Sequence, residues 1–126
     1  MATPVRYIVN DTADAIAFYE QLGFEERMNP GPGFAMLERG DLRLLLNTPG
    51  GGGGAGQPMS DGTLPEPGGW NRFQLETDDL DAEVGRLTSA GATFRSPVID
   101  GMGGRQVLVE DPSGNLVELF EAKGAA

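Results

Sequence analysis

The feature that most constrains this sequence is an internal duplication. Shifting the chain by 68 positions brings the start of the second half onto the start of the first: Asp11 on Asp79, Ile16 on Val84, and Gly23 on Gly91. The ends of the two halves coincide at a shift of 74, with Gly40 on Gly114 and Leu45 on Leu119. A repeat of about 70 residues is longer than the units of solenoid proteins. We therefore expect one module that is present twice.

The first half is expected to begin with a strand over residues 5–9, because β-branched and aromatic side chains dominate there. A helix is predicted over residues 13–22, since apolar side chains recur at helical spacing and Asn10 or Asp11 can cap its start. Gly23 follows where a left-handed residue usually ends a helix. Two short strands, 34–37 and 41–47, are predicted around a turn at Arg39-Gly40.

The second half repeats this order. A strand is predicted over residues 73–77 and a helix over 81–90, with Asp78 or Asp79 as its cap and Gly91 after its end. Strands over 105–110 and 115–121 are joined by residues 111–114, whose Pro112 and Gly114 suit a tight turn. The modules therefore span about residues 4–47 and 70–121.

Residues 48–69 form a glycine- and proline-rich segment between the modules. It contains five consecutive glycines, 50–54, and four prolines. Loops longer than about 12–15 residues are uncommon and are usually functional or disordered. One interpretation is a flexible tether between two rigid modules, and the other is a lid, in which residues 59–70 fold over a pocket.

The composition removes several classes of chemistry. The sequence has no cysteine and no histidine, which excludes disulfides, thiol nucleophiles, thiolate or imidazole metal ligands and histidine-dependent triads. A net charge of −10 argues against nucleic acid or an anionic membrane surface as a partner. The N-terminus shows no secretory signal and the apolar runs are too short to span a bilayer. We expect a cytoplasmic protein of one domain, residues 1–126.

Three motifs point to a known family. Residues 11–24 and 110–120, together with Ala90-Gly91-Ala92, resemble the vicinal oxygen chelate superfamily of glyoxalase I, extradiol dioxygenases, fosfomycin-modifying enzymes and bleomycin-resistance proteins. The resemblance implies an α+β fold in which two tandem βαβββ modules form an open, U-shaped sheet around a cavity. Because this fold supports many activities, the site must decide the function.

In the enzymes of that superfamily, four residues hold a divalent metal, one from the first and one from the last strand of each module. Counted from the motifs, the resemblance puts these positions at Pro4, Leu44, Arg72 and Glu118. Only Glu118 carries a group that ligates metals, and a catalytic zinc or iron needs about three protein ligands. We therefore expect a chain without a metal and without another cofactor.

Strand alternation predicts which side chains replace the metal site, because residues two apart share a sheet face. The predicted cavity face carries these residues: Pro4, Arg6, Ile8, Leu42, Leu44 and Leu46 in the first module, and Arg72, Gln74, Glu76, Leu116, Glu118 and Phe120 in the second. Since the family positions at 72 and 118 bind one ion, Arg72 and Glu118 should approach closely. The pair is interpreted as a polar handle for a ligand or as a purely structural contact.

Further contacts are predicted around this face. Trp70, the only tryptophan, can cover a flat ligand, or it can pack against the sheet edge. Arg105 can reach the mouth of the cavity, or it can close the end of a sheet. The predicted ligand-binding set is Trp70, Arg72, Glu118, Phe34, Leu44, Arg6, Gln74, Phe120, Met102 and Arg105.

The leading functional hypothesis is sequestration of a toxic small molecule, as the resemblance to the metal-free bleomycin-resistance branch implies. That branch implies a homodimer whose crevices hold a flat aromatic natural product such as a bleomycin, a mitomycin or an anthraquinone-fused enediyne. The alternative is a metal-free isomerase or lyase with Glu118 or Glu76 as acid or base. A module that binds an unassigned metabolite is a third hypothesis.

Overall fold

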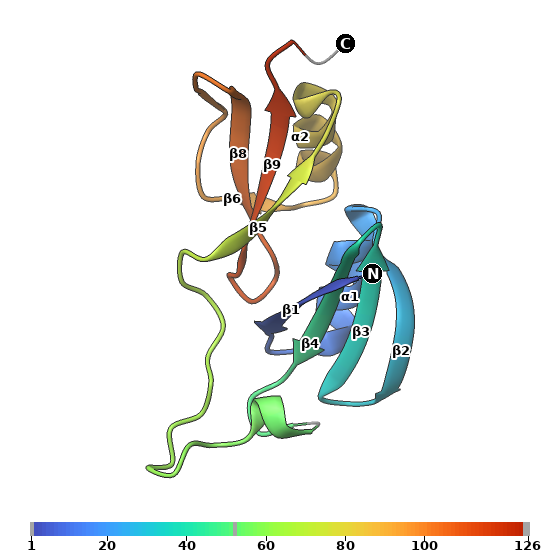
Figure 1. The fold of residues 1–126 in the computed structure, drawn as a ribbon, viewed down its shortest axis with the longest axis vertical. Coiled ribbons are helices and arrows are strands. Elements are labelled where there is room, and N and C mark those ends of the chain that lie inside the picture. The colour runs from blue at the N-terminus through green and yellow to red at the C-terminus, as the bar shows by residue number, and fades with distance from the viewer. Residues whose placement is uncertain (1, 52, 125–126) are drawn as a thin grey trace. The chain divides into compact units, whose positions relative to one another are not determined.

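The computed structural model of the protein describes residues 2–51 and 53–124, so residue 52 of the predicted glycine run lies outside the described residues. The chain divides into two units between Gly68 and Gly69. Within the described residues, each unit contains a sheet and one α-helix of ten residues (Figure 1). The predicted mixed α+β class is confirmed.

The first unit has the order strand, helix and three strands. Its elements are β1 (Thr3–Ile8), α1 (Thr12–Gln21), β2 (Glu25–Gly31), β3 (Phe34–Arg39) and β4 (Leu42–Asn47). The sheet order is β1-β4-β3-β2, in which β1 runs parallel to β4 and the other pairs are antiparallel.

Helix α1 begins and ends where the sequence predicts, within one residue. The Asp11 carboxylate caps the helix by accepting a hydrogen bond from the Ala13 backbone N–H at 2.8 Å. Gly23 follows with a φ of +86°, which a residue with a side chain rarely adopts. The apolar stripe of α1 packs on the sheet, with Tyr19 fully buried in edge-to-face contact with Phe24.

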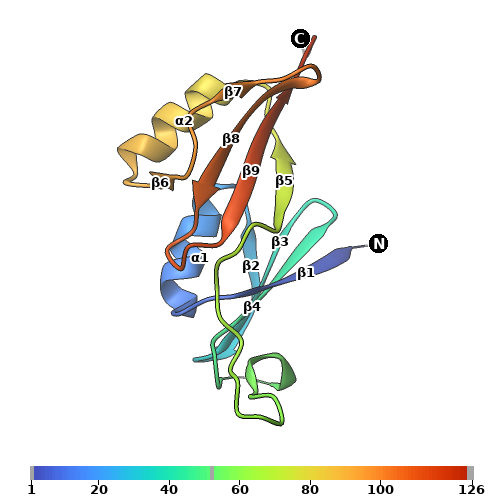
Figure 2. The ribbon, with the colours of Figure 1, turned by 90° about the vertical axis from the view of Figure 1, so that its left-hand side faces the viewer.

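The second unit repeats this order with a more divided sheet. Its elements are β5 (Arg72–Glu76), α2 (Leu80–Ser89), β6 (Thr93–Phe94), β7 (Ile99–Asp100), β8 (Gly104–Glu110) and β9 (Leu116–Ala122). The order is β5-β9-β8-β6, with β7 also paired to β8 (Figure 2). Strand β5 runs parallel to β9, as β1 does to β4.

The predicted cap and turn of the second unit are confirmed. Asp79 caps α2 through the Ala82 backbone N–H at 3.0 Å. Between β8 and β9, the Asp111 carboxylate accepts hydrogen bonds from the backbone of Ser113 and from the backbone and side chain of Asn115. These contacts satisfy two buried polar side chains and fix a five-residue connection.

Strand β2 belongs to the βαβββ order that the resemblance implies, but the residue pattern did not predict its position. Its first six residues are exposed, so it lacks the alternation of apolar and polar residues that marks a half-buried strand. Its first two residues are Glu25 and Glu26, which are both exposed. Arg27 bridges Glu25 and Glu38, which links β2 to β3.

The predicted face of Leu44 is wrong. The register of the parallel pair places Leu44 opposite Val5 and Leu45 opposite Arg6, and residues directly opposite share a face. Leu44 is fully buried in the core of the unit, with its neighbours Leu42 and Leu46 on the same face. The residue on the Arg6 face is therefore Leu45.

Among the described residues of 48–51 and 53–69, Gly54–Gly56 form a short 3-10 helix, η1, and the others form irregular backbone (Figure 2). None of the helices in the described part of the chain is long and apolar enough to cross a membrane.

Candidate functional site

The candidate site lies on one face of the second sheet. Cross-strand pairs place Gln74 opposite Glu118 and Glu118 opposite Leu108, while Leu116 lies between Arg72 and Glu110. These residues share a face. The other face carries Val107, Val109, Val117 and Leu119, which are buried on the side of α2.

Glu118 is held by two side chains from β5. Arg72 approaches one carboxylate oxygen of Glu118 through Nε and Nη2, each at 3.1 Å. Gln74 donates its amide N–H to the other oxygen at 2.7 Å. The predicted approach of Arg72 and Glu118 is confirmed, and Gln74 completes a cluster of three.

The Arg72–Gln74–Glu118 cluster is satisfied within the chain. Glu118 is 9% exposed, and removing a carboxylate from water is unfavourable unless charge and hydrogen bonds compensate. Both oxygens have donors, and among the described residues no buried side-chain nitrogen or oxygen lacks a hydrogen-bond partner. The cluster therefore fixes the direction of the Glu118 carboxylate and of the Arg72 guanidinium.

The metal of the related enzymes does not fit this chain. The register makes Leu45 the counterpart of Glu118, so the four family positions hold Pro4, Leu45, Arg72 and Glu118. In residues 2–51 and 53–124, no group of three or more histidine, cysteine, aspartate or glutamate side chains could hold a metal ion. The positive charge beside Glu118 comes from the chain itself, because the Arg72 guanidinium forms an ion pair with the Glu118 carboxylate.

Trp70 lies two residues before the start of β5 and is 66% exposed. The Arg95 guanidinium lies over its ring, with Cζ 4.9 Å from the ring centroid. Arg95 also donates to the Gly69 carbonyl at 3.0 Å, to the Gly114 carbonyl at 3.1 Å and to Glu110 at 3.2 Å. Sequence reasoning missed Arg95, because its partners lie 15 to 26 residues away and no local pattern connects them.

Two further predicted residues lie in the first unit. Arg6 donates from Nη1 to the Asn47 side-chain oxygen at 2.7 Å, and Phe34 lies opposite Asn47 across β3 and β4. Arg6, Phe34 and Asn47 therefore share the sheet face that points away from the buried Leu44.

Arg105 does not lie on the Glu118 face. It alternates with Gln106 on β8 and therefore shares the face of α2, where it makes two hydrogen bonds with Asp81 at 3.1 and 2.9 Å. The hydrogen bond with Asp81 raises the pKa of Arg105, and the same contact lowers the pKa of Asp81. The prediction that Arg105 reaches the mouth of the site on the Glu118 face is wrong, because its guanidinium is hydrogen-bonded to Asp81 of α2 on the opposite face.

Met102 and Phe120 flank the far end of the second sheet. Met102 is 95% exposed in the connection between β7 and β8. Phe120 lies beside Gly104, where a Cβ atom would be 3.0 Å from the tip of the ring. Phe120 is on the Glu118 face by alternation, and Glu76 lies opposite it as an exposed carboxylate at the end of β5.

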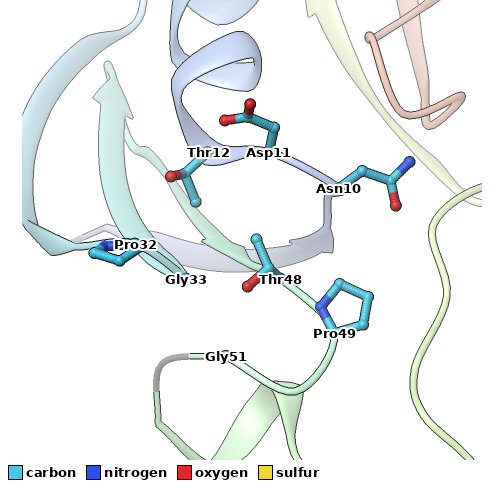
Figure 3. Close-up of a pocket in the computed structure, with 8 residues that line it drawn as sticks. All are labelled: Asn10, Asp11, Thr12, Pro32, Gly33, Thr48, Pro49 and Gly51. Atoms are coloured by element: carbon cyan, nitrogen blue, oxygen red, sulfur yellow. The ribbon is translucent and has the colours of Figure 1, made fainter.

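A cavity of about 560 Å³ lies in the first unit at the start of α1. Figure 3 shows the eight residues that line it: Asn10, Asp11, Thr12, Pro32, Gly33, Thr48, Pro49 and Gly51. The predicted ligand-binding residues are not among them. A cavity of about 370 Å³ in the second unit includes Arg105 and Lys123 in its lining.

The comparisons with known proteins agree with this architecture. A family model described as "Glyoxalase/Bleomycin resistance protein/Dioxygenase superfamily" matches residues 3–119. None of the curated proteins compared matches the chain.

Solved structures of the same fold include three of particular interest. A superfamily member from Sphaerobacter thermophilus DSM 20745 is 29% identical, covers 96% of each chain and has a TM-score of 0.74. TnmS3, an antibiotic binding protein from Streptomyces sp. CB03234, is 26% identical over 98% of this chain and 96% of its own, with a TM-score of 0.72. A lactoylglutathione lyase from Agrobacterium tumefaciens is 22% identical over 96% of this chain and 92% of its own, with a TM-score of 0.72, and shares the fold. Because the family model matches nearly the whole length of the chain, this chain belongs to the glyoxalase, bleomycin resistance protein and dioxygenase superfamily.

Proposed function

We propose that this protein binds and sequesters a flat aromatic antibiotic or related natural product without a metal. The proposal rests on the exposed Trp70, whose backbone carbonyl accepts a hydrogen bond from Arg72, the residue that occupies the position of a metal ligand in the resemblance. A flat aromatic molecule gains both buried area and stacking on such a ring. The fixed Arg72 and Glu118 side chains then supply polar contacts that orient it.

The proposed ligand-binding residues follow from the faces described above. In the second unit they are Trp70, Arg72, Gln74, Glu118 and Phe120, with the exposed Met102 as an apolar contact. In the first unit they are Arg6 and Phe34. We further propose a homodimer, as the resemblance to the bleomycin-resistance branch implies, with ligand crevices formed by both chains.

Similarity to TnmS3 supports binding rather than turnover. Its printed description is an antibiotic binding protein, and it is 26% identical to this chain over almost the full length of both. The alternative, acid–base catalysis by Glu118 or Glu76, requires a carboxylate that is free to exchange a proton with a substrate. Both Glu118 oxygens accept hydrogen bonds from the chain's own donors, and Glu76 is exposed to water rather than desolvated.

The first test is a titration of Trp70 fluorescence with a panel of flat aromatic antibiotics in the presence of a chelator. The only tryptophan reports binding without interference from others. Saturable quenching with the ligand recovered unmodified supports the proposal. Chemical conversion of the ligand, or a requirement for metal, contradicts it.

A pair of variants assigns the polar contact. Glu118→Gln is expected to weaken a cationic ligand by about 1–3 kcal/mol, the typical value of a hydrogen bond to a charged group. Glu83→Gln is the matched control, because Glu83 makes an exposed ion pair with Arg86 on α2 and loses the same charge. Equal affinity of both variants removes Glu118 from the site.

A further inference from the structure

Two consecutive backbone carbonyls at the start of the second unit are each held by a guanidinium group. Arg95 donates from Nη1 to the Gly69 carbonyl at 3.0 Å, and Arg72 donates from Nη1 to the Trp70 carbonyl at 3.3 Å. Residues 69 and 70 carry no regular secondary structure. Their position therefore depends on these side-chain contacts.

Each guanidinium is itself fixed by a carboxylate on the same sheet face. Arg95 pairs with Glu110 of β8 at 3.2 Å, and Arg72 pairs with Glu118 of β9 at 3.1 Å. The side chains of Arg95 and Glu110 are each 25% exposed, so water competes only partly for this pair. Two ion pairs anchored in the sheet thus hold one dipeptide, Gly69-Trp70.

Besides the Gly69 carbonyl, Arg95 contacts the ring of Trp70. Its guanidinium lies over the indole at 4.9 Å, and an arginine stacks well on an aromatic face because it is planar and weakly hydrated. Trp70 is nevertheless 66% exposed. The ring is therefore supported by Arg95 and open to solvent over most of its surface.

We propose that Arg95 is the positioning residue of the ligand site: it orders the Trp70 ring in advance and thereby sets the affinity for a stacked ligand. The inference rests on the proposed function, since it concerns the same site. A side chain that is ordered before binding loses less conformational freedom when the ligand arrives. Arg95 acts through Trp70, and Trp70 touches the ligand.

Two variants of Arg95 test the ordering step without any ligand. Arg95→Gln removes the charge and Arg95→Lys retains it, but neither can make three directed hydrogen bonds and stack at once. Both are expected to lower the near-ultraviolet circular dichroism of Trp70 and to raise its quenching by acrylamide. Arg86→Gln is the matched control, because Arg86 makes an exposed pair with Glu83 on α2. An unchanged Trp70 signal in both Arg95 variants overturns the proposal.

The ligand step is tested by a double-mutant cycle in calorimetry, with the panel member that binds the wild-type protein most tightly. Arg95→Gln is expected to weaken binding about three- to tenfold when Trp70 is present. In a Trp70→Leu background the same change should have no effect, because no ring remains to be ordered. An equal loss in both backgrounds means that Arg95 binds the ligand directly and overturns the positioning role.

The two proposals fail in different ways. If the wild-type protein binds no member of the panel, the proposed function fails, while the circular dichroism of the Arg95 variants still decides whether Arg95 orders Trp70. If the wild-type protein binds but loss of Trp70 order leaves the affinity unchanged, the proposed function stands and the inference about Arg95 is overturned.

Discussion

Replacing Glu118 by glutamine tests whether the Arg72–Gln74–Glu118 cluster is held as described. The substitution preserves the shape of the side chain but removes its charge. Arg72 then loses its carboxylate partner, and the glutamine keeps one acceptor oxygen for the two donors, Arg72 and Gln74, because its other oxygen is replaced by an NH2 donor. The guanidinium of Arg72, whose side chain is 30% exposed, is left without charge compensation.

The magnitude follows from the burial of the two partners. Removing one member of a fully buried ion pair costs about 3–5 kcal/mol. The Arg72 side chain is 30% exposed and that of Glu118 is 11% exposed, so water recovers part of this loss. We expect a destabilisation of about 1.5–3 kcal/mol. For a chain of 126 residues, each kcal/mol of destabilisation lowers Tm by about 4 °C.

The assay is urea unfolding followed by circular dichroism, with Glu83→Gln as the charge-matched control. The control should change the free energy of unfolding by less than about 0.5 kcal/mol, because its ion pair is exposed. A double variant, Arg72→Met with Glu118→Leu, should approach wild-type stability, since apolar side chains can replace a buried pair without loss. Wild-type stability of Glu118→Gln alone would show that the ion pair with Arg72 does not stabilise the fold.

Three further predictions concern the core, the surface and the turn. Leu44→Ala should destabilise the protein by about 2–5 kcal/mol and Leu45→Ala by clearly less, since Leu44 is fully buried and Leu45 is not; the reverse order in urea unfolding would contradict the register. The hydrogen bond from Arg105 lowers the pKa of Asp81, so this contact stabilises the fold above the ordinary carboxylate pKa and the contribution is lost as the pH falls through the lowered value. Asp81→Asn should therefore reduce stability at neutral pH and flatten its decline in acid, and an acid transition identical to that of the wild type would exclude the pair. Asp111→Ala leaves backbone donors of a buried turn without an acceptor and should cost about 1–3 kcal/mol in thermal unfolding; an unchanged Tm would show that the turn does not depend on this carboxylate.

The duplicated module was predictable because each half carries its own local signals. Asp11 and Asp79 cap their helices, and Gly23 and Gly91 follow them with φ near +86°. Such signals act over a few residues and need no tertiary context. The Arg72–Glu118 contact was also predictable, since the resemblance assigned both positions to one site.

The face of Leu44 was not predictable from the aligned turns. The turn between the last paired residues of β3 and β4 contains two residues, whereas the turn between those of β8 and β9 contains five. Aligning Gly40 with Gly114 therefore shifts β4 by one residue, and such a shift moves a side chain to the opposite face of a sheet. Only the pairing of Val5 with Leu44 reveals the correct register.

The roles of Arg95 and Arg105 depend on contacts between distant segments. Arg95 reaches Gly69 and Glu110, and Arg105 reaches Asp81 on α2, at separations of 15 to 26 residues. Periodicity and capping describe neighbours in the chain and say nothing of such partners. A long, flexible arginine side chain can reach partners on several sides of its backbone position. Its partners therefore depend on the fold and cannot be deduced from its position in the sequence.

The proposed function requires that this protein binds its ligand and leaves it chemically unchanged. Equilibrium dialysis in a chelator, followed by mass spectrometry of the ligand on both sides of the membrane, distinguishes binding from chemical conversion. Sequestration predicts saturable retention of a flat aromatic antibiotic at a fixed ratio per chain, with the ligand recovered at its original mass. Ligand that accumulates as a product of altered mass or isomeric form, or retention only after metal is restored, would contradict it.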